Sequence, residues 1–266
     1  MSWRCSREFS RPTVSFLRGR VRGARRPEGA PGDRGRKVHV PALPRVGLGS
    51  RETAEDVART LACYHAVIAA RVFDHKLLEQ MAAAKAAPVL NMLSATDHPL
   101  QALADLLTIK QLLGEIEGSR IAFIGEANNV ARSLAEGCAL LGAELNIASP
   151  AGFGFGSPML AVNQLVDPAE AIDGADIVYS DVWVSMGDED SNERQELFAP
   201  YQVDAALMER APSAHFLHCL PARRGEGVDL VAVEDGEPVD DVGARIGGCD
   251  RVANQVHVFR QRGIAG

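Results

Sequence analysis

The sequence predicts an α/β protein built from two doubly wound parallel-sheet domains, of which the first is incomplete. Two observations support this prediction. From about residue 46 onward, short apolar runs alternate with longer segments of helical periodicity, which is typical of parallel strands joined by helical crossovers. The apolar runs also lack a polar face, and this indicates strands that are covered on both sides of a sheet.

The first regular elements follow residue 46. Apolar residues recur at helical spacing over 52–61, and Glu55 and Asp56 occupy the first turn, where the helix dipole favours acids. The apolar run 66–70 then predicts a buried strand. The same criteria predict helices at 76–86, 100–113 and 129–141, a helix end at 171–173, and strands at 88–92, 120–125, 144–148, 177–179 and 216–220.

The composition is that of a globular protein, and it excludes several classes. Of the 266 residues 46% are hydrophobic while the net charge is only −7, which excludes a wholly disordered chain. No apolar run reaches the roughly 18–20 residues of a membrane helix, so we expect no membrane partner. The five cysteines form no CxxC pair, which predicts reduced thiols in a cytoplasmic protein and no metal site.

Residues 1–37 differ from the rest of the chain in charge and pattern. They contain eleven Lys and Arg against three acids, a net charge of +8, so the remaining residues sum to −15. We expect residues 1–45 to be an aberrant, disordered basic segment, with the composition of a GC-rich gene read out of frame. A transit peptide is one alternative. A nucleic-acid-binding arm is another, but the arm lacks aromatic residues between its charges and the body is acidic, so we expect no nucleic-acid partner.

In parallel sheets, ligands bind where the strands end, so polar residues in those loops form the candidate site. His98 and Pro99 follow a predicted strand, and Pro99 fits the first turn of the next helix. Gln101 then lies beside the free backbone N–H groups of that turn, where an anion or a polarised carbonyl is favoured. Neutral His and Gln both donate hydrogen bonds. A capping and packing role is the alternative.

A second loop joins predicted strand 120–125 to the helix at 129–141. Only Gly125 is present where a dinucleotide-binding turn has GxGxxG, so that function has little support. Asn128 and Asn129 offer amide groups suited to the carboxylate or ammonium of an amino acid. A simple N-cap role for Asn129 is the alternative.

Asp181 ends a third predicted strand, where it is placed to hold the ammonium group of a basic amino acid. Ser185 and the backbone around Met186 and Gly187 would complete such a site, and the glycine indicates a loop that can move. The alternative is structural, with Asp181 capping the strand end and Met186 in the core.

Cys219 lies at the end of the last predicted strand, between His218 and the rigid pair Leu220-Pro221. A nucleophilic Cys219 with His218 as its base is the first interpretation. Adjacent residues on a strand point to opposite faces, however, so His218 would not naturally activate Cys219. A thiol that binds or orients substrate and a buried inert thiol are therefore the alternatives.

Together these loops resemble the ornithine carbamoyltransferase family. The Ser-Met-Gly loop and the cysteine of the last motif distinguish this branch from the aspartate branch of the superfamily. The matching motifs, in consistent order within residues 46–225, are His98-Pro99-Leu100-Gln101-Ala102-Leu103-Ala104-Asp105, Asn128-Asn129, Asp181-Val182-Trp183-Val184-Ser185-Met186-Gly187 and His218-Cys219-Leu220-Pro221.

The resemblance implies transfer of the carbamoyl group of carbamoyl phosphate to the δ-amino group of L-ornithine, which gives L-citrulline and phosphate in arginine biosynthesis or arginine catabolism. It implies a homotrimer that needs no metal and no organic cofactor. Oxyanion stabilisation and alignment of the two reactants would supply the rate. The implied domains are a carbamoyl-phosphate-binding domain at 46–113, an ornithine-binding domain at 114–250 and a truncated closing helix at 251–266.

The resemblance also implies roles for individual residues. The expected catalytic residues are Arg71, His98 and Cys219. Carbamoyl phosphate would be bound by Arg71, His98, Gln101, Cys219 and Leu220, and ornithine by Asn129, Asp181, Ser185 and Met186.

The chain departs from the family pattern at the phosphate site. The family's Ser-Thr-Arg-Thr-Arg loop is represented only by the stretch from Ser10 to Phe16, which lacks the second arginine and contains Pro12. Gln255 stands where the family has a second phosphate-site arginine. Each charge-assisted contact that is lost would cost about 1.5–3 kcal/mol.

Two alternative functions remain beside the leading one. A carbamoyltransferase for another amine, such as putrescine or an acylated ornithine, would keep the chemistry, but Asp181 and the Ser-Met-Gly loop favour ornithine. The missing arginines favour a non-catalytic relative that only binds an amino acid.

Overall fold

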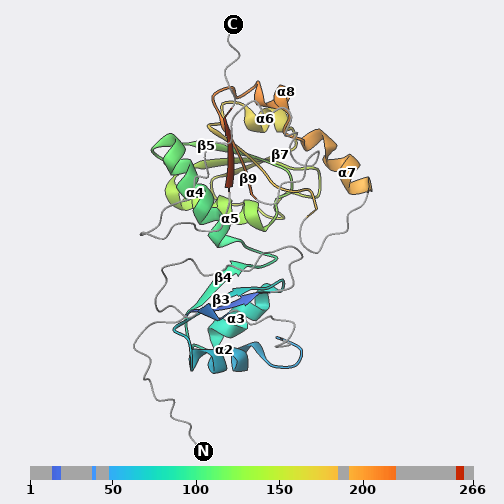
Figure 1. The fold of residues 1–266 in the computed structure, drawn as a ribbon. Coiled ribbons are helices and arrows are strands. Elements are labelled where there is room, and N and C mark those ends of the chain that lie inside the picture. The colour runs from blue at the N-terminus through green and yellow to red at the C-terminus, as the bar shows by residue number, and fades with distance from the viewer. Residues whose placement is uncertain (1–13, 19–37, 40–47, 185–191, 220–255, 261–266) are drawn as a thin grey trace, which may run out of the picture. The chain divides into compact units, whose positions relative to one another are not determined.

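The computed structural model divides into two compact units, residues 1–98 and residues 99–266, which are described separately. None of the described helices is long and apolar enough to span a membrane. The structure describes residues 14–18, 38–39, 48–184, 192–219 and 256–260 (Figure 1).

The first unit contains a four-stranded parallel sheet with the strand order β2-β1-β3-β4. Its core forms where α2 and α3 pack on β3, around the buried Val57, Ile68, Leu78 and Met81. The elements are β1 (Val14–Arg18), β2 (Val38–His39), α2 (Ala54–Ala62), β3 (Val67–Arg71), α3 (His75–Ala83) and β4 (Val89–Leu93).

Strands β1 and β2 correct one prediction. We expected residues 1–45 to lack secondary structure, but β1 pairs with β3 residue by residue, from Val14 opposite Val67 to Arg18 opposite Arg71. The reason is local, because the sequence Val-Ser-Phe-Leu is rich in the β-branched and aromatic types that favour strands. Pairing also covers an edge of β3 that would otherwise be open.

The second unit contains a six-stranded sheet with the strand order β10-β9-β8-β5-β6-β7. All neighbours are parallel except β10, which runs antiparallel to β9. The elements are α4 (Pro99–Leu113), β5 (Arg120–Ile124), α5 (Asn129–Leu141), β6 (Glu144–Ala148), β7 (Val162–Leu165), α6 (Pro168–Ile172), β8 (Ile177–Ser180), α7 (Asn192–Phe198), the 3₁₀ turn η1 (Ala199–Tyr201), α8 (Ala205–Met208), β9 (His215–Cys219) and β10 (Val256–Arg260).

Helices cover the two faces of this second sheet (Figure 1), and a hydrophobic cluster lies on each face. Helices α4 and α5 supply Ile109 and Leu134 to one cluster, which also contains Phe123 of β5. Helices α6 and α8 supply Ile172 and Met208 to the other. Alternate residues of the strands face the two clusters, as the continuous apolar runs predicted. The predicted α/β class with doubly wound parallel sheets is confirmed.

The order in which successive strands join the sheet reverses beside β5. From there β6 and β7 extend the sheet one way, whereas β8 and β9 extend it the other way. The switch point therefore lies between β5 and β8, and ligands bind at the carboxyl ends of strands at such points. Asn128 follows β5 and Asp181 follows β8, so both residues lie at this end of the sheet.

One predicted feature of the second unit differs from the structure, and it lies near the C-terminus. The predicted domain at 46–113 stays a prediction: helix α4 packs against α5, and the compact units divide between His98 and Pro99. The closing helix expected at 251–266 is replaced by strand β10 over Val256–Arg260. The sequence Val-His-Val-Phe-Arg alternates β-favouring residues, and pairing with β9 satisfies its backbone on one side.

Candidate functional site

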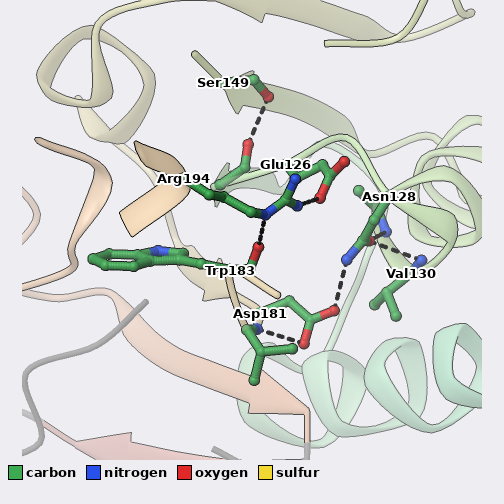
Figure 2. Close-up of polar contacts among 10 residues, drawn as sticks. Glu126, Asn128, Val130, Ser149, Asp181, Trp183 and Arg194 are labelled. Atoms are coloured by element: carbon green, nitrogen blue, oxygen red, sulfur yellow. Dashed lines mark hydrogen bonds and ion pairs between the residues drawn. The ribbon is translucent and has the colours of Figure 1, made fainter. Parts of the chain in front are cut away.

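Asp181, directly after β8, is the centre of a buried polar cluster (Figure 2). Asn128 Nδ2 donates to its Oδ2 at 2.8 Å, while the backbone N–H of Val182 and the thiol of Cys219 each donate to its Oδ1 at 2.7 Å. Only 8% of Asp181 is exposed. A carboxylate offers about four acceptor positions, so one further donor can bind here.

Asn128, and not Asn129, caps helix α5. The Oδ1 of Asn128 accepts hydrogen bonds from the backbone N–H groups of Val130 and Ala131, at 3.0 and 3.1 Å (Figure 2). The alternative that Asn129 is the N-cap is therefore wrong, since Asn129 is the first residue of the helix itself. One amide side chain thus starts α5 and orients the carboxylate of Asp181.

The Cys219 thiol is held in its protonated form. Burial, followed by the charge of Asp181 and the hydrogen bond to it, raises the pKa of Cys219 well above its ordinary value, while a hydrogen bond from Tyr179 acts in the opposite direction. The Nδ1 of His218 donates to the carbonyl oxygen of Cys219, whereas the thiol itself donates to the Asp181 carboxylate. The geometry favours a thiol that donates to Asp181 over a nucleophile activated by His218.

A second buried cluster joins helix α4 to strand β8. Asp105 is fully buried, and it accepts hydrogen bonds from Gln101 Nε2 at 2.9 Å and from Tyr179 Oη at 3.1 Å. Burial raises the pKa of Asp105 to about 7, although these two hydrogen bonds lower it, and the charge of Asp181 adds to the rise. Tyr179 and Asp181 are two residues apart in sequence, which places both side chains on the same side of the sheet.

Arg194 of α7 joins two loops beside Asp181 (Figure 2). Its Nη2 forms an ion pair with Glu126 from the loop after β5, and its Nε donates to the carbonyl oxygen of Trp183. The guanidinium carbon also lies 5.2 and 5.1 Å from the ring centroids of Phe153 and Phe198. With side chains only 13% and 23% exposed, this charge pair is largely shielded from water.

Arg71 and His98 lie in the first unit, at one edge of its sheet. Arg71 ends β3, and the parallel neighbour β4 ends at the same edge. The loop after β4 is built around the buried Ser94, whose Oγ accepts from the backbone N–H of Asp97 at 3.1 Å and lies 2.8 Å from Nδ1 of His75. This loop leads directly to the half-buried His98.

The structure brings several of the predicted site residues together. Asp181 and Cys219 are in direct contact, and Gln101 belongs to the same unit. Arg71 and His98 share the first unit. Ser185, Met186 and Leu220 lie outside the described residues.

Sequence reasoning did not assign a role to Asp105, Tyr179, Glu126 or Arg194. For Asp105 a signal was present, because its i+4 spacing from Gln101 places both on one face of α4. Tyr179 lies within an apolar strand and has the pattern of a core residue. Glu126 and Arg194 are 68 positions apart, so no local pattern could pair them.

Within the described part of the chain, Asp181, His218 and Cys219 are the side chains that could share one cation, because their donor atoms lie within 4.8 Å of one another. The thiol proton is engaged with Asp181, however, and burial disfavours the thiolate that a metal would need. The arrangement therefore suits a hydrogen-bonded polar ligand better than a metal ion.

The fold and the site define an α/β protein of two units with a nearly buried carboxylate at the switch point of the second sheet. Two family models match its sequence: "Aspartate/ornithine carbamoyltransferase, carbamoyl-P binding domain" over residues 35–111 and "Aspartate/ornithine carbamoyltransferase, Asp/Orn binding domain" over residues 117–239. The chain belongs to the aspartate/ornithine carbamoyltransferase family. The resemblance predicted from the strand-end motifs is thereby confirmed.

Named relatives lie on the ornithine side of this family. The ornithine carbamoyltransferase of Bacillus subtilis is 45% identical over 204 residues, 70% of this chain and 63% of the relative. That of Cenarchaeum symbiosum is 42% identical over 221 residues, 79% and 70% of the two chains. The solved ornithine carbamoyltransferase from Pyrococcus furiosus matches with a TM-score of 0.71 and 34% identity, over 82% of this chain and 74% of that one. The chain thus spans about two thirds of the length of these curated relatives.

Proposed function

We propose that this chain transfers the carbamoyl group of carbamoyl phosphate to the δ-amino group of L-ornithine, giving L-citrulline and phosphate. Its family and its relatives named ornithine carbamoyltransferase support the proposal. The observation that carries it is Asp181, a nearly buried carboxylate at the switch point with one acceptor position left for an ammonium group.

In the proposed complex, the ammonium of ornithine binds Asp181, which Asn128 and Cys219 hold in place. Asn129, together with Ser185 and Met186, completes the amino-acid site. The flexible substrate would then be fixed at its amino-acid end, so that its δ-amino group is presented to the second reactant.

Carbamoyl phosphate is bound in this proposal by Arg71, His98 and Gln101, with Cys219 and Leu220 at the junction of the two sites. The neutral δ-amine attacks the carbonyl carbon, and hydrogen-bond donors stabilise the oxyanion of the tetrahedral intermediate. The bond from carbon to the phosphate oxygen then breaks, and the phosphate leaves with the proton that the amine gives up. The proposal involves no metal and no organic cofactor.

We further propose a homotrimer in which a neighbouring subunit completes the phosphate site, since the stretch from Ser10 to Phe16 lacks an arginine of the family pattern. Light scattering on the purified chain tests this assembly. A relative from Pyrococcus furiosus is named anabolic, which favours arginine biosynthesis over catabolism as the role of the reaction.

The test is citrulline formation by the purified 266-residue chain with carbamoyl phosphate and ornithine, with putrescine as the comparison amine. We expect ornithine-dependent turnover, and a loss of roughly tenfold to hundredfold in kcat/KM for ornithine in Asp181→Asn, as the loss of one charge-assisted contact predicts. Asp173→Asn, which removes an exposed carboxylate in the same unit, should leave kcat/KM unchanged. No turnover with either amine would contradict the proposal, and ornithine binding without turnover would identify an amino-acid-binding relative.

A further inference from the structure

The orientation of the Gln101 amide is fixed by its neighbour one turn along α4. An ionised carboxylate can only accept hydrogen bonds, so the 2.9 Å contact between Gln101 and Asp105 must use the NH₂ group of the amide. The amide oxygen, Oε1, then lies on the other side of the planar group. Among the described residues, Oε1 has no hydrogen-bond partner.

A second hydrogen bond, from Tyr179, fixes the Asp105 carboxylate. Tyr179 of β8 donates to Oδ2 at 3.1 Å, while Gln101 uses Oδ1, so each oxygen of the carboxylate has its own donor. The Tyr179 ring is fixed in turn by stacking on Phe123, with centroids 5.3 Å apart. The side chain that sets the Gln101 amide is therefore anchored to the sheet and cannot easily rotate.

We propose that Asp105 is a positioning residue that turns the Gln101 amide so that Oε1 faces the substrate, and that it thereby makes the carbamoyl site select an NH₂ group over a methyl group. This inference rests on the proposed function. A carbamoyl group and an acetyl group have nearly the same shape, and they differ in that only the carbamoyl NH₂ can donate a hydrogen bond to Oε1. A methyl group would leave this oxygen, which belongs to a largely buried residue, without a donor.

Two unreactive phosphonates allow the NH₂ group and the methyl group to be compared by binding alone. Phosphonoacetamide carries the NH₂ group, whereas 2-oxopropylphosphonate carries a methyl group in its place, and neither can transfer its acyl group. The two ligands share the phosphonate and the carbonyl, so the ratio of their dissociation constants reports only on NH₂ recognition. Binding is measured by calorimetry at pH 8, where Asp105 is mainly ionised because its pKa is about 7.

Three variants separate positioning from folding. Asp105→Leu removes the acceptor at similar volume, and Asp105→Ala removes it without added volume if the leucine variant does not fold. Asp105→Asn is the conservative variant, because its Oδ1 can still accept from Gln101. Thr108→Val is the matched control: it removes a buried side-chain hydrogen bond on the same helix, from Oγ1 to the carbonyl oxygen of Ala104.

The unmodified chain and Thr108→Val should bind the amide at least about tenfold more tightly than the ketone, as one lost hydrogen bond to a buried acceptor predicts. In Asp105→Leu or Asp105→Ala this preference should fall below about threefold, and Asp105→Asn should largely restore it. A preference that survives the loss of Asp105 overturns the inference alone. Failure of the unmodified chain to bind either phosphonate would instead contradict the proposed function, and the inference with it.

Discussion

The Cys219 thiol donates a 2.7 Å hydrogen bond to the Asp181 carboxylate, and this contact links the ends of two neighbouring parallel strands, β9 and β8. A thiol in this position could be a nucleophile or a donor, and its surroundings favour the donor. Burial and the adjacent carboxylate both oppose ionisation. The sulfur therefore contributes to holding the Asp181 carboxylate in place.

Cys219 should resist alkylation in the folded protein. Its pKa is raised well above the ordinary value, and each unit of that rise lowers the thiolate fraction tenfold. We expect iodoacetamide at pH 8 to modify the exposed Cys63 at least about 100-fold faster than Cys219, followed by mass spectrometry of the peptides. Equal rates for the two thiols would show a reactive thiolate and restore the interpretation of Cys219 as a nucleophile.

Asn128 allows helix capping to be separated from substrate binding. Asn128→Ser keeps an N-cap for α5 but is too short to reach Asp181, whereas Asn128→Ala loses both functions. Both variants should raise KM for ornithine, while only the alanine variant should lose about 1 kcal/mol of unfolding free energy. Thermal unfolding and ornithine titration check the two effects. Normal ornithine KM in both variants would mean that Asp181 does not depend on Asn128.

The ion pair between Arg194 and Glu126 should be energetically coupled. Because both side chains are shielded, a double-mutant cycle with Arg194→Met and Glu126→Gln should give a coupling free energy of about 1–3 kcal/mol in urea unfolding. Arg210 and Asp173 form the matched control, since their side chains are 45% and 55% exposed, and their coupling should be much smaller. Equal coupling in the two pairs would show that shielding has no effect here.

Asp105 should make the folded protein less stable as pH rises from about 4 to about 7. The ordinary pKa of 3.8 applies to the unfolded chain and about 7 to the folded one, so the folded state binds more protons in this window, and unfolding free energy falls with rising pH. Asp105→Asn lacks this titration. Relative to the unmodified chain, the variant should therefore gain about 3 kcal/mol between pH 5 and pH 8.

Urea unfolding at pH 5 and pH 8 measures the difference in unfolding free energy between Asp105→Asn and the unmodified chain. The contributions of titratable groups that both proteins contain largely cancel in this difference. The side chains that share the surroundings of Asp105 are Gln101, Tyr179, Cys138, Asp181 and Cys219. A difference between variant and parent that does not change with pH would show that Asp105 titrates near its ordinary value when folded.

The helices and strands that could be predicted from sequence are those whose burial imposes a pattern. β5 and α5 were placed from apolar period alone, because both are buried in the second unit. β7 could not be placed, because Asn163 and Gln164 are exposed on an edge strand and break the apolar run. β10 was expected to be helical by analogy with the family, although its own residues favour a strand.

The residues of the candidate site also fall into those that could be predicted from sequence and those that could not. Asp181, Gln101 and Cys219 were found because they follow strands or open a helix, where position in the chain implies position at the sheet edge. The contact between Tyr179 and Asp105 spans 74 positions, and neither residue stands at such an end. Long-range pairs of this kind depend on how α4 packs on the sheet, which sequence period does not specify.

Under the proposed function, the double use of Asn128 limits how this chain could evolve toward other amines. Its amide both starts α5 and orients Asp181, so most substitutions that change the orientation of Asp181 also loosen a helix of the core. Only substitutions to the few side chains that cap helices well would change the contact to Asp181 without weakening the start of α5. Selection for a new amine, in nature or in the laboratory, would therefore meet fewer constraints at Asn129, which follows the cap, than at position 128.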